Sequence, residues 1–511
     1  MGTKGIDSMI HLLCTSDIHG NLLNYDVALN QSKPYGLSSL PTLLETFNRL
    51  NTILIDNGDV LQGSAFATYL NTHPKAKHSI ALAMNACQVQ YFNLGNHDFN
   101  YGLDVLFSFL KELDAPCISG NVHYLGKPLG QSVIHTIENQ KIGIIGAVTD
   151  YIPHWEKPEH IKGVTFIDVL SYVKAEVERL RPLVDHVIVV YHGGFERDLE
   201  SGVPTERLTG ENVGYALSEI EGIDVLFTGH QHRSIAHVKN QSALLQCGFE
   251  GIEVMHASLD KQTWIPSLIE LSKYPMVEDI KNLYQDDVKP FEAWLNTPCG
   301  ALDEDRYQLA DNLQDRLVKP ALISLFNQIM MKETNADCAS SSLFNSLVGL
   351  PQNPTMKDLL AAYPFPNIVV VKRLDKPTLL AYLEQNASFF SLDEKGNIVI
   401  TPSFVYPKKQ LYNYDMIDGI EYTMDISRPV GQRITECLFK GQPLDDDLVL
   451  RCAMNNYRSV GGGDFAMIAS APIDYDTGKD MMTLLVEALT SKHVIKVNHT
   501  NNIKIVAGEK L

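Results

Sequence analysis

The chain contains 511 residues, of which 45% are hydrophobic, and its 61 acidic and 42 basic side chains give a formal net charge of −19 at pH 7. Because domains average roughly 100–200 residues, a chain of this length is expected to form two or three of them. Its ordinary apolar content excludes a disordered chain. Its acidity excludes a non-specific DNA- or RNA-binding protein, because such binding relies on Lys and Arg to neutralise phosphates.

Residues 9–270 alternate short apolar runs with longer helical patterns. The runs that predict strands lie at residues 10–14, 52–55, 90–94, 142–148, 186–191 and 223–228. Apolar residues recur near helical spacing at residues 40–50, 78–86, 103–113 and 169–180. Continuous apolar strands joined by helical connections are typical of an α/β fold with a buried sheet.

The pattern changes after residue 270. Residues 271–320 begin as a charged, helical stretch that predicts a linker. Residues 321–511 combine a helix-like segment at 376–390, with Pro377 suited to its first turn, with turn-rich and strand-like segments. We expect a second, α+β domain there.

Polar residues follow five of the predicted strands. The segments are Asp17-Ile-His19-Gly-Asn21, Asp56-Asn-Gly-Asp59, Gly95-Asn96-His97-Asp98, His192-Gly-Gly and Gly229-His230-Gln-His232. Each segment alone is more often a cap or a hydrogen-bonding turn; Asp56, for example, suits a helix cap as well as the support of a metal ligand. Sites in open α/β sheets lie beyond the carboxyl ends of strands, so five such segments in order predict one shared site.

The side chains in these segments suit transition metals. Imidazole, carboxylate and amide ligands together favour Mn²⁺, Zn²⁺, Fe²⁺ or Co²⁺ over Mg²⁺ and Ca²⁺, which prefer oxygen ligands. The number of ligands favours two ions, and a carboxylate such as Asp59 can bridge them. Two ions about 3.5–4 Å apart activate a water and stabilise the oxygens of an in-line displacement at phosphorus. They would also create a cationic patch within an acidic protein.

In this order, the five segments resemble the calcineurin-like metallophosphoesterase superfamily. Further segments resemble the 5′-nucleotidase C-terminal domain, at residues 337–345, 363–367, 383–390, 419–425 and 455–464. Within that group the chain is most similar to bacterial 2′,3′-cyclic-nucleotide 2′-phosphodiesterase/3′-nucleotidases. The resemblance implies a four-layer α/β/β/α sandwich domain at residues 9–270, a helical linker at 271–320 and an α+β substrate-binding domain at 321–511.

The resemblance also implies roles for individual residues. One metal ion would be held by Asp17, His19, Asp59 and His232, and the other by Asp59, Asn96, His192 and His230. His97 would lie over the substrate phosphate, where it stabilises transition-state charge or protonates the leaving oxygen.

In the C-terminal domain the family stacks the base between two aromatic rings, and the matching positions are Tyr414 and Tyr457. Asp464 would accept hydrogen bonds from the base edge. Asn345 and Arg458 are further substrate-binding candidates, although a surface salt bridge is the more frequent role of such an arginine.

The sequence departs from the 5′-nucleotidase pattern at two places. The catalytic histidine of that group pairs with an Asp three residues later, where this chain has Asn100. Because an amide stabilises an imidazolium less well than a carboxylate does, His97 should be less basic, or Asp98 should take that catalytic part. The family's phosphate-binding Arg is also absent from residues 344–350. Both departures favour the cyclic-nucleotide branch.

We therefore predict a dinuclear-metal phosphoesterase that hydrolyses 2′,3′-cyclic nucleotides and 3′-nucleotides through in-line attack by a metal-bridging hydroxide. A 5′-nucleotidase or a nucleotide-sugar pyrophosphatase would use the same ions. A non-catalytic metal- or nucleotide-binding protein is disfavoured by the complete ligand set.

The expected partners are small nucleotides, without nucleic acid polymers or membranes, and the expected state is a monomer or weak dimer. The chain starts without an apolar leader and its 8 cysteines are scattered, so we expect a cytoplasmic protein. A secreted, cell-wall or periplasmic location would follow if a leader had been removed.

Overall fold

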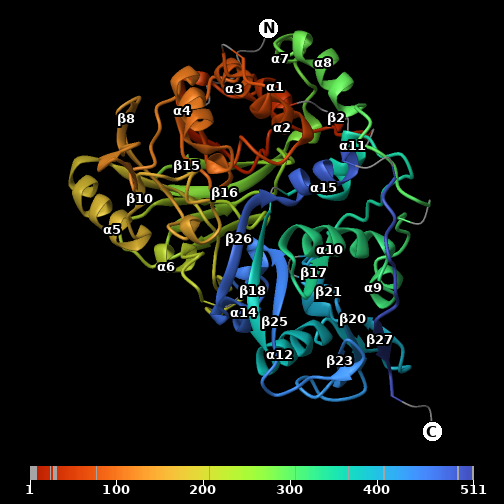
Figure 1. Ribbon diagram of the computed structural model, residues 1–511. Helices are drawn as coiled ribbons and strands as arrows, with labels where there is room; N and C mark the ends of the chain where they lie inside the picture. Colours follow the sequence, from red (N-terminus) through yellow and green to blue (C-terminus); the bar gives the residue numbers. More distant parts are fainter. Residues whose placement is uncertain are drawn as a thin grey trace. The chain divides into compact units, whose positions relative to one another are not determined.

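A computed structural model describes residues 9–508 apart from 23–24, 27–30, 76, 206–207, 305–306, 366, 407–408 and 492–493. The chain divides into two compact units, Met1–Glu292 and Ala293–Leu511 (Figure 1). The division lies within the predicted linker 271–320, so the first part of that segment belongs to one unit and the rest to the other. The start of the chain, on which the leader prediction rests, lies outside the described residues.

The described part of the first unit is built around two sheets. The first has the strand order β16-β15-β1-β4-β5, with β1 (Ile10–Thr15), β4 (Thr52–Asp56), β5 (Tyr91–Phe92), β15 (Glu253–Asp260) and β16 (Thr263–Glu270). The second has the order β13-β14-β12-β11-β9-β8, with β8 (Val133–Ile137), β9 (Gln140–Val148), β11 (His186–His192), β12 (Val225–Thr228), β13 (Ile235–Lys239) and β14 (Ser242–Gln246). The strands at the centre of each sheet run parallel. Helices connect most of these pairs, while β13 lies between β12 and β14 in the chain.

Shorter strands and helices complete this unit. The short strands are β2 (Tyr25–Asp26) with β3 (Gln31–Ser32), and β6 (Val122–Tyr124), β7 (Lys127–Pro128) and β10 (Val164–Phe166). The helices are α1 (Leu40–Leu44), α2 (Ala65–Thr72), α3 (Ser79–Ala86), α4 (Gly102–Glu112), α5 (Val169–Leu180), α6 (Gly214–Ser218) and α7 (Glu278–Asn282). Helix α8 (Gln285–Leu295) begins in this unit and contains the division after Glu292. Helix α5 has its predicted bounds because Asp168 caps it, accepting a hydrogen bond from the Ser171 N–H.

The layers of the first unit follow from where its apolar side chains are buried. One cluster joins Leu12 and Ile53 of the first sheet with Ile144 and Ile188 of the second, so the two sheets share a core. On the outer face of the second sheet, β9, β11, β12 and β14 pack against α5 and α6. On the first sheet, the ring of Phe92 in β5 packs edge-on against Phe109 of α4, with 5.2 Å between ring centroids. The predicted four-layer α/β/β/α sandwich is confirmed.

The second unit is α+β, as predicted. Its larger sheet has the order β21-β17-β25-β18-β26, with β17 (Cys338–Ser342), β18 (Ile368–Asp375), β21 (Asp415–Asp418), β25 (Val449–Asn455) and β26 (Ile473–Asp480). A second sheet has the order β24-β23-β22-β27, with β22 (Ile420–Asp425), β23 (Ile434–Phe439), β24 (Gln442–Pro443) and β27 (Ile503–Val506). A hairpin joins β19 (Phe390–Leu392) and β20 (Ile398–Ile400).

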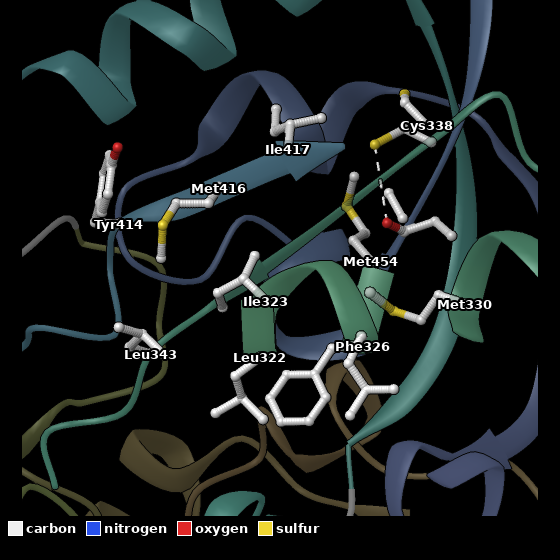
Figure 2. Packing of buried hydrophobic residues seen from close by; sticks show 14 of the residues in the cluster. Leu322, Ile323, Phe326, Met330, Cys338, Leu343, Tyr414, Met416, Ile417 and Met454 are labelled. Atoms are coloured by element: carbon white, nitrogen blue, oxygen red, sulfur yellow. Dashed lines mark hydrogen bonds between the residues drawn. The ribbon is translucent and has the colours of Figure 1, made fainter. Parts of the chain in front are cut away.

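Helices cover these sheets and fill the core of the second unit. They are α9 (Gln314–Leu317), α10 (Ala321–Thr334), α11 (Met356–Ala362), α12 (Lys376–Ala387), α13 (Asn456–Ser459), α14 (Ala466–Ser470) and α15 (Met481–Thr490). Helix α10 is buried along most of its length, and Figure 2 shows Ile323, Phe326 and Met330 of this helix among the side chains of β17, β21 and β25. None of the helices in the described part of the chain has the length and apolar character needed to cross a bilayer.

Candidate metal centre

The first unit gathers the polar segments that follow its strands. Two groups of side chains could each hold a metal ion, and within each group the potential ligand atoms lie within 4.8 Å of one another. The groups are Asp17, His19 and His232, and Asp59, His192 and His230. Asp17 and His232 are more than 200 positions apart, and they meet because the two sheets pack together, so that residues following β1 and β4 of one sheet lie beside residues following β11 and β12 of the other.

The backbone at this centre adopts a conformation that is rare outside glycine. Five of the predicted ligands have positive φ angles: Asp17 (55°), His19 (51°), Asp59 (58°), His230 (67°) and His232 (56°). Such left-handed residues cost of order 1–3 kcal/mol each, and they accumulate at functional sites. The chain also needs glycine for close approach, since a Cβ at Gly95 would lie 2.1 Å from Asp59 Oδ1.

Hydrogen bonds orient the histidines of this centre. His192 Nδ1 lies 2.6 Å from the carbonyl of Asn57, and His19 Nδ1 lies 2.8 Å from the carbonyl of Gln62. A carbonyl only accepts, so Nδ1 carries the proton in both rings and Nε2 is left to bind a cation.

In His230 the two ring nitrogens exchange roles. Its Nε2 carries the proton, because it faces a carboxylate that only accepts, and its Nδ1 is left to bind a cation. Its Nε2 lies 2.9 Å from Glu211 Oε1, and its Nδ1 lies 2.8 Å from Asn96 Oδ1. This contact brings Asn96 to the second group, as predicted. Glu211 was not predicted from the sequence, because it lies in a loop without a strand-end motif.

Two buried atoms provide a test of whether a metal ion fits. Among the described residues, neither Asp59 Oδ2 nor His192 Nε2 has a hydrogen-bond partner, although the two atoms lie 3.2 Å apart. Buried polar atoms are almost always paired, because leaving them unpaired costs free energy. A divalent cation between them would satisfy both atoms, taking the place of the proton that His192 Nε2 carries when no ion is bound.

The charges of the site favour cation binding. Burial alone would raise the pKa of Asp59, but the positive charges of His192 and His97 outweigh it and hold that pKa well below its usual range. Burial would lower the pKa of His192, yet Asp59 and Asp17 raise it to about 10. Burial, with the charge of His232, lowers the pKa of His19 to about 4. Despite its burial, the pKa of Asp17 is lowered as well, mainly by the charge of His192, so Asp17 and Asp59 are both ionised at neutral pH.

The alternative prediction, that Asp98 pairs with His97, is wrong. The Asp98 carboxylate is fully buried and accepts hydrogen bonds from four backbone N–H groups. The donors are Asp59 at 3.0 Å, Val60 at 2.9 Å, Leu61 at 3.1 Å and Gly95 at 2.8 Å. Asp98 therefore shapes the loop that presents Asp59.

Replacing Asp98 by alanine should destabilise the first unit strongly. Each buried backbone N–H that loses its acceptor costs roughly 1–3 kcal/mol, so we expect the free energy of unfolding to fall by at least about 3 kcal/mol. Denaturant unfolding of the variant would measure this, with exposed Asp114→Ala as the control. An unchanged unfolding midpoint would show that the four hydrogen bonds do not hold the loop.

His97 lies beside the two groups rather than within them. Its backbone N–H donates to Asp59 Oδ1 at 2.7 Å, and its ring lies edge-on to that of His19 with 5.4 Å between centroids. Its Nδ1 lies 2.7 Å from Asn100 Oδ1. Asn100 therefore occupies the position of the Asp that pairs with the histidine in the 5′-nucleotidase pattern.

Aromatic side chains flank the centre on two sides. Trp155 stacks on His230 with 5.4 Å between ring centroids, and Phe249 stacks on His232 at 4.9 Å. Phe249 remains 40% exposed. Neither was predicted, because each lies in a loop without periodicity.

Two of the substrate-binding predictions in the second unit are corrected. Tyr414 is fully buried, and its ring stacks on Phe389 at 5.1 Å, so it belongs to the core and cannot stack on a base. Arg458 is 2% exposed and pairs with Asp415 through its Nε at 2.5 Å. Its charge is thus neutralised inside the unit, neither bound to phosphate nor placed in a surface salt bridge.

The remaining predicted residues of the second unit are more accessible. Tyr457 is half-buried, and its ring lies edge-on to that of Tyr412, with 6.1 Å between ring centroids. Asp464 is exposed and has a φ of 68°. Asn345 is half-buried, but its amide joins the Lys409 carbonyl and the Leu411 N–H, both at 2.9 Å.

Comparison with known proteins supports both units. Residues 10–234 match the family model described as calcineurin-like phosphoesterase, and residues 300–470 match that of the 5′-nucleotidase C-terminal domain. A crystal structure from Staphylococcus aureus, provisionally named a 5′-nucleotidase and complexed with alpha-ketoglutarate, is 32% identical with a TM-score of 0.88. The match covers 98% of this chain and 100% of that one.

Two curated relatives are named 2′,3′-cyclic-nucleotide 2′-phosphodiesterase/3′-nucleotidase. The relative from Yersinia enterocolitica is 24% identical over 95% of this chain and 86% of its own length. The relative from Salmonella typhimurium is 25% identical over 89% of this chain and 81% of its own length. The chain therefore belongs to the 5′-nucleotidase family of calcineurin-like metallophosphoesterases and is a metal-dependent phosphoesterase that acts on nucleotides.

Proposed function

We propose that this enzyme hydrolyses 2′,3′-cyclic nucleotides and 3′-nucleotides at a centre that holds two divalent cations. The observation that carries the phosphoesterase chemistry is the pair of ligand groups built from Asp, His and Asn. The preference for cyclic nucleotides is supported by the names of the two curated relatives and by Asn100, which departs from the 5′-nucleotidase pattern. The ligand types suit Mn²⁺, Zn²⁺, Fe²⁺ or Co²⁺.

The side chains of the site divide the work of the reaction. When bound, the two cations supply Lewis-acid charge at the phosphoryl oxygens and lower the pKa of the attacking water. The Nδ1–H of His97 donates a hydrogen bond to Asn100 Oδ1, so Nε2 is the ring atom that exchanges a proton. As water oxygen bonds to phosphorus and the P–O2′ bond breaks, Nε2 gives its proton to the leaving oxygen. His97 thereby passes from imidazolium to neutral imidazole, and the proton lost by the attacking water restores the imidazolium through solvent.

The experiment that tests this function is a substrate panel with the Mn²⁺-loaded protein. We expect higher kcat/KM for 2′,3′-cAMP and 3′-AMP than for 5′-AMP and UDP-glucose. Preference for 5′-AMP or UDP-glucose would favour a 5′-nucleotidase or a nucleotide-sugar pyrophosphatase. Stoichiometric metal without hydrolysis of any phosphoester would indicate a non-catalytic binding protein.

We also propose that the enzyme works in the cytoplasm as a monomer or weak dimer. The scattered cysteines, which suit reduced thiols, support the compartment. Cell fractionation and sedimentation of the purified protein would test the two statements.

Tyr457→Ala should weaken nucleotide binding without removing the chemistry. Base stacking on an aromatic ring is worth roughly 1–3 kcal/mol, so KM for 3′-AMP should rise about tenfold while kcat stays similar. Steady-state kinetics with 3′-AMP and with a simple aryl phosphate, which has no base, would separate the two effects. An equal rise in KM for both substrates would argue against stacking. The exposed Tyr406→Ala is the control.

A further inference from the structure

A carboxylate outside the predicted site lies behind the catalytic histidine. Asn100 Nδ2 donates to Glu156 Oε2 at 2.5 Å, while Asn100 Oδ1 lies 2.7 Å from His97 Nδ1. The three side chains form a continuous chain of hydrogen bonds. Glu156 is 56 positions from Asn100 in the sequence.

The carboxylate determines which way the amide faces. An ionised carboxylate only accepts hydrogen bonds, so Asn100 must turn its NH₂ group toward Glu156 and its oxygen toward His97. That oxygen in turn accepts from His97 Nδ1, which must carry a proton. The proton that takes part in the reaction is consequently the one on Nε2.

Glu156 is itself held firmly. Its side chain is 6% exposed, and its Oε1 accepts from His160 Nδ1 at 2.8 Å and from the Lys157 N–H at 2.9 Å. The preceding residue, Trp155, stacks on the metal-binding residue His230. The turn that carries Glu156 therefore packs against the metal centre. The buried carboxylate is stabilised by hydrogen bonds, without which its burial would cost free energy.

Within the proposed function of this site, on which the inference rests, we propose that Glu156 is a positioning residue for His97. Through Asn100 it orients the imidazole, fixes its tautomer and supplies the negative charge that a directly bonded Asp supplies in 5′-nucleotidases. Here the Asn100 amide lies between the carboxylate and the imidazole, and it orients the imidazole without transferring a proton. Glu156 belongs to neither of the two ligand groups.

The test exchanges the acid and the amide. In Glu156→Gln the charge is lost, and the new NH₂ group must face either the NH₂ of Asn100 or the Lys157 N–H, both of which are donors. The kcat for the preferred nucleotide should therefore fall at least about tenfold at similar KM. The double variant Asn100→Asp/Glu156→Gln restores one negative charge and every hydrogen bond. Its kcat should return to within about threefold of the native value.

Three measurements make the outcome unambiguous. Metal content by elemental analysis and the thermal unfolding midpoint should be unchanged in both variants, because Glu156 is not a ligand. Bis(p-nitrophenyl) phosphate, whose leaving group needs no proton, should lose little rate in Glu156→Gln. The control Glu159→Gln removes an exposed carboxylate of the same segment and should change nothing.

Full nucleotide turnover in Glu156→Gln would overturn the proposal. A double variant no faster than the single one would also overturn it, because it would show that Glu156 acts only by holding its turn. If the native enzyme prefers 5′-AMP, the proposed substrate preference fails. The role of Glu156 is then still tested, by comparing kcat for 5′-AMP among the native enzyme, Glu156→Gln and the double variant, so the two failures are distinguishable.

Discussion

Replacing Asp59 by asparagine is expected to abolish turnover and to release metal. Its Oδ1 accepts from the His97 N–H at 2.7 Å, and its Oδ2 faces His192 Nε2 at 3.2 Å. An amide lacks the charge that attracts a cation, and its NH₂ group would oppose either the N–H or the ligand nitrogen. Loss of a partner behind a ligand already costs 10–100-fold in many metal sites, so we expect kcat/KM to fall by more than about 100-fold.

Metal content and nucleotide hydrolysis of the purified variant would measure both effects. Asp104→Asn, which removes an exposed carboxylate from the first turn of α4, is the matched control. Full activity with full metal content in Asp59→Asn would contradict the assignment of Asp59 to the metal centre.

Replacing His97 by alanine should reduce kcat while the metal remains bound. His97 lies outside the two ligand groups, but its ring adjoins that of His19. A general acid contributes typically 10²–10⁴-fold to a rate, so kcat for 3′-AMP should fall by about that factor. An aryl phosphate with a good leaving group should lose much less.

Elemental analysis beside kinetics would separate this role from metal binding. Loss of metal from His97→Ala would identify the ring as a ligand, and unchanged kcat would exclude it from the reaction. The exposed His73→Ala serves as the control for removing an imidazole.

Apolar runs and the polar turns after them predicted the buried sheets and a shared site, whereas the four-layer sandwich and the division of ligands between two ions were implied by the family resemblance. Strands β1, β4, β11 and β12 are continuous apolar runs, each followed by a polar turn, so the buried strands and the candidate ligands at their carboxyl ends follow from short segments. The bounds of α5 likewise follow from Asp168 and the apolar spacing after it.

The tertiary structure decided what surrounds those ligands. Asp98 adjoins His97 in sequence yet bonds to the Asp59 loop, whereas the carboxylate behind His97 comes from Glu156. Tyr414 matches an aromatic position of the family but lies in the core of its unit. Such contacts join residues that are distant in sequence and leave no periodic pattern, so residue type alone cannot distinguish a buried partner from a residue that meets the substrate. The sequence by itself determined which residues are able to bind the metal ions. Only the packing of loops determined which neighbouring groups orient those residues.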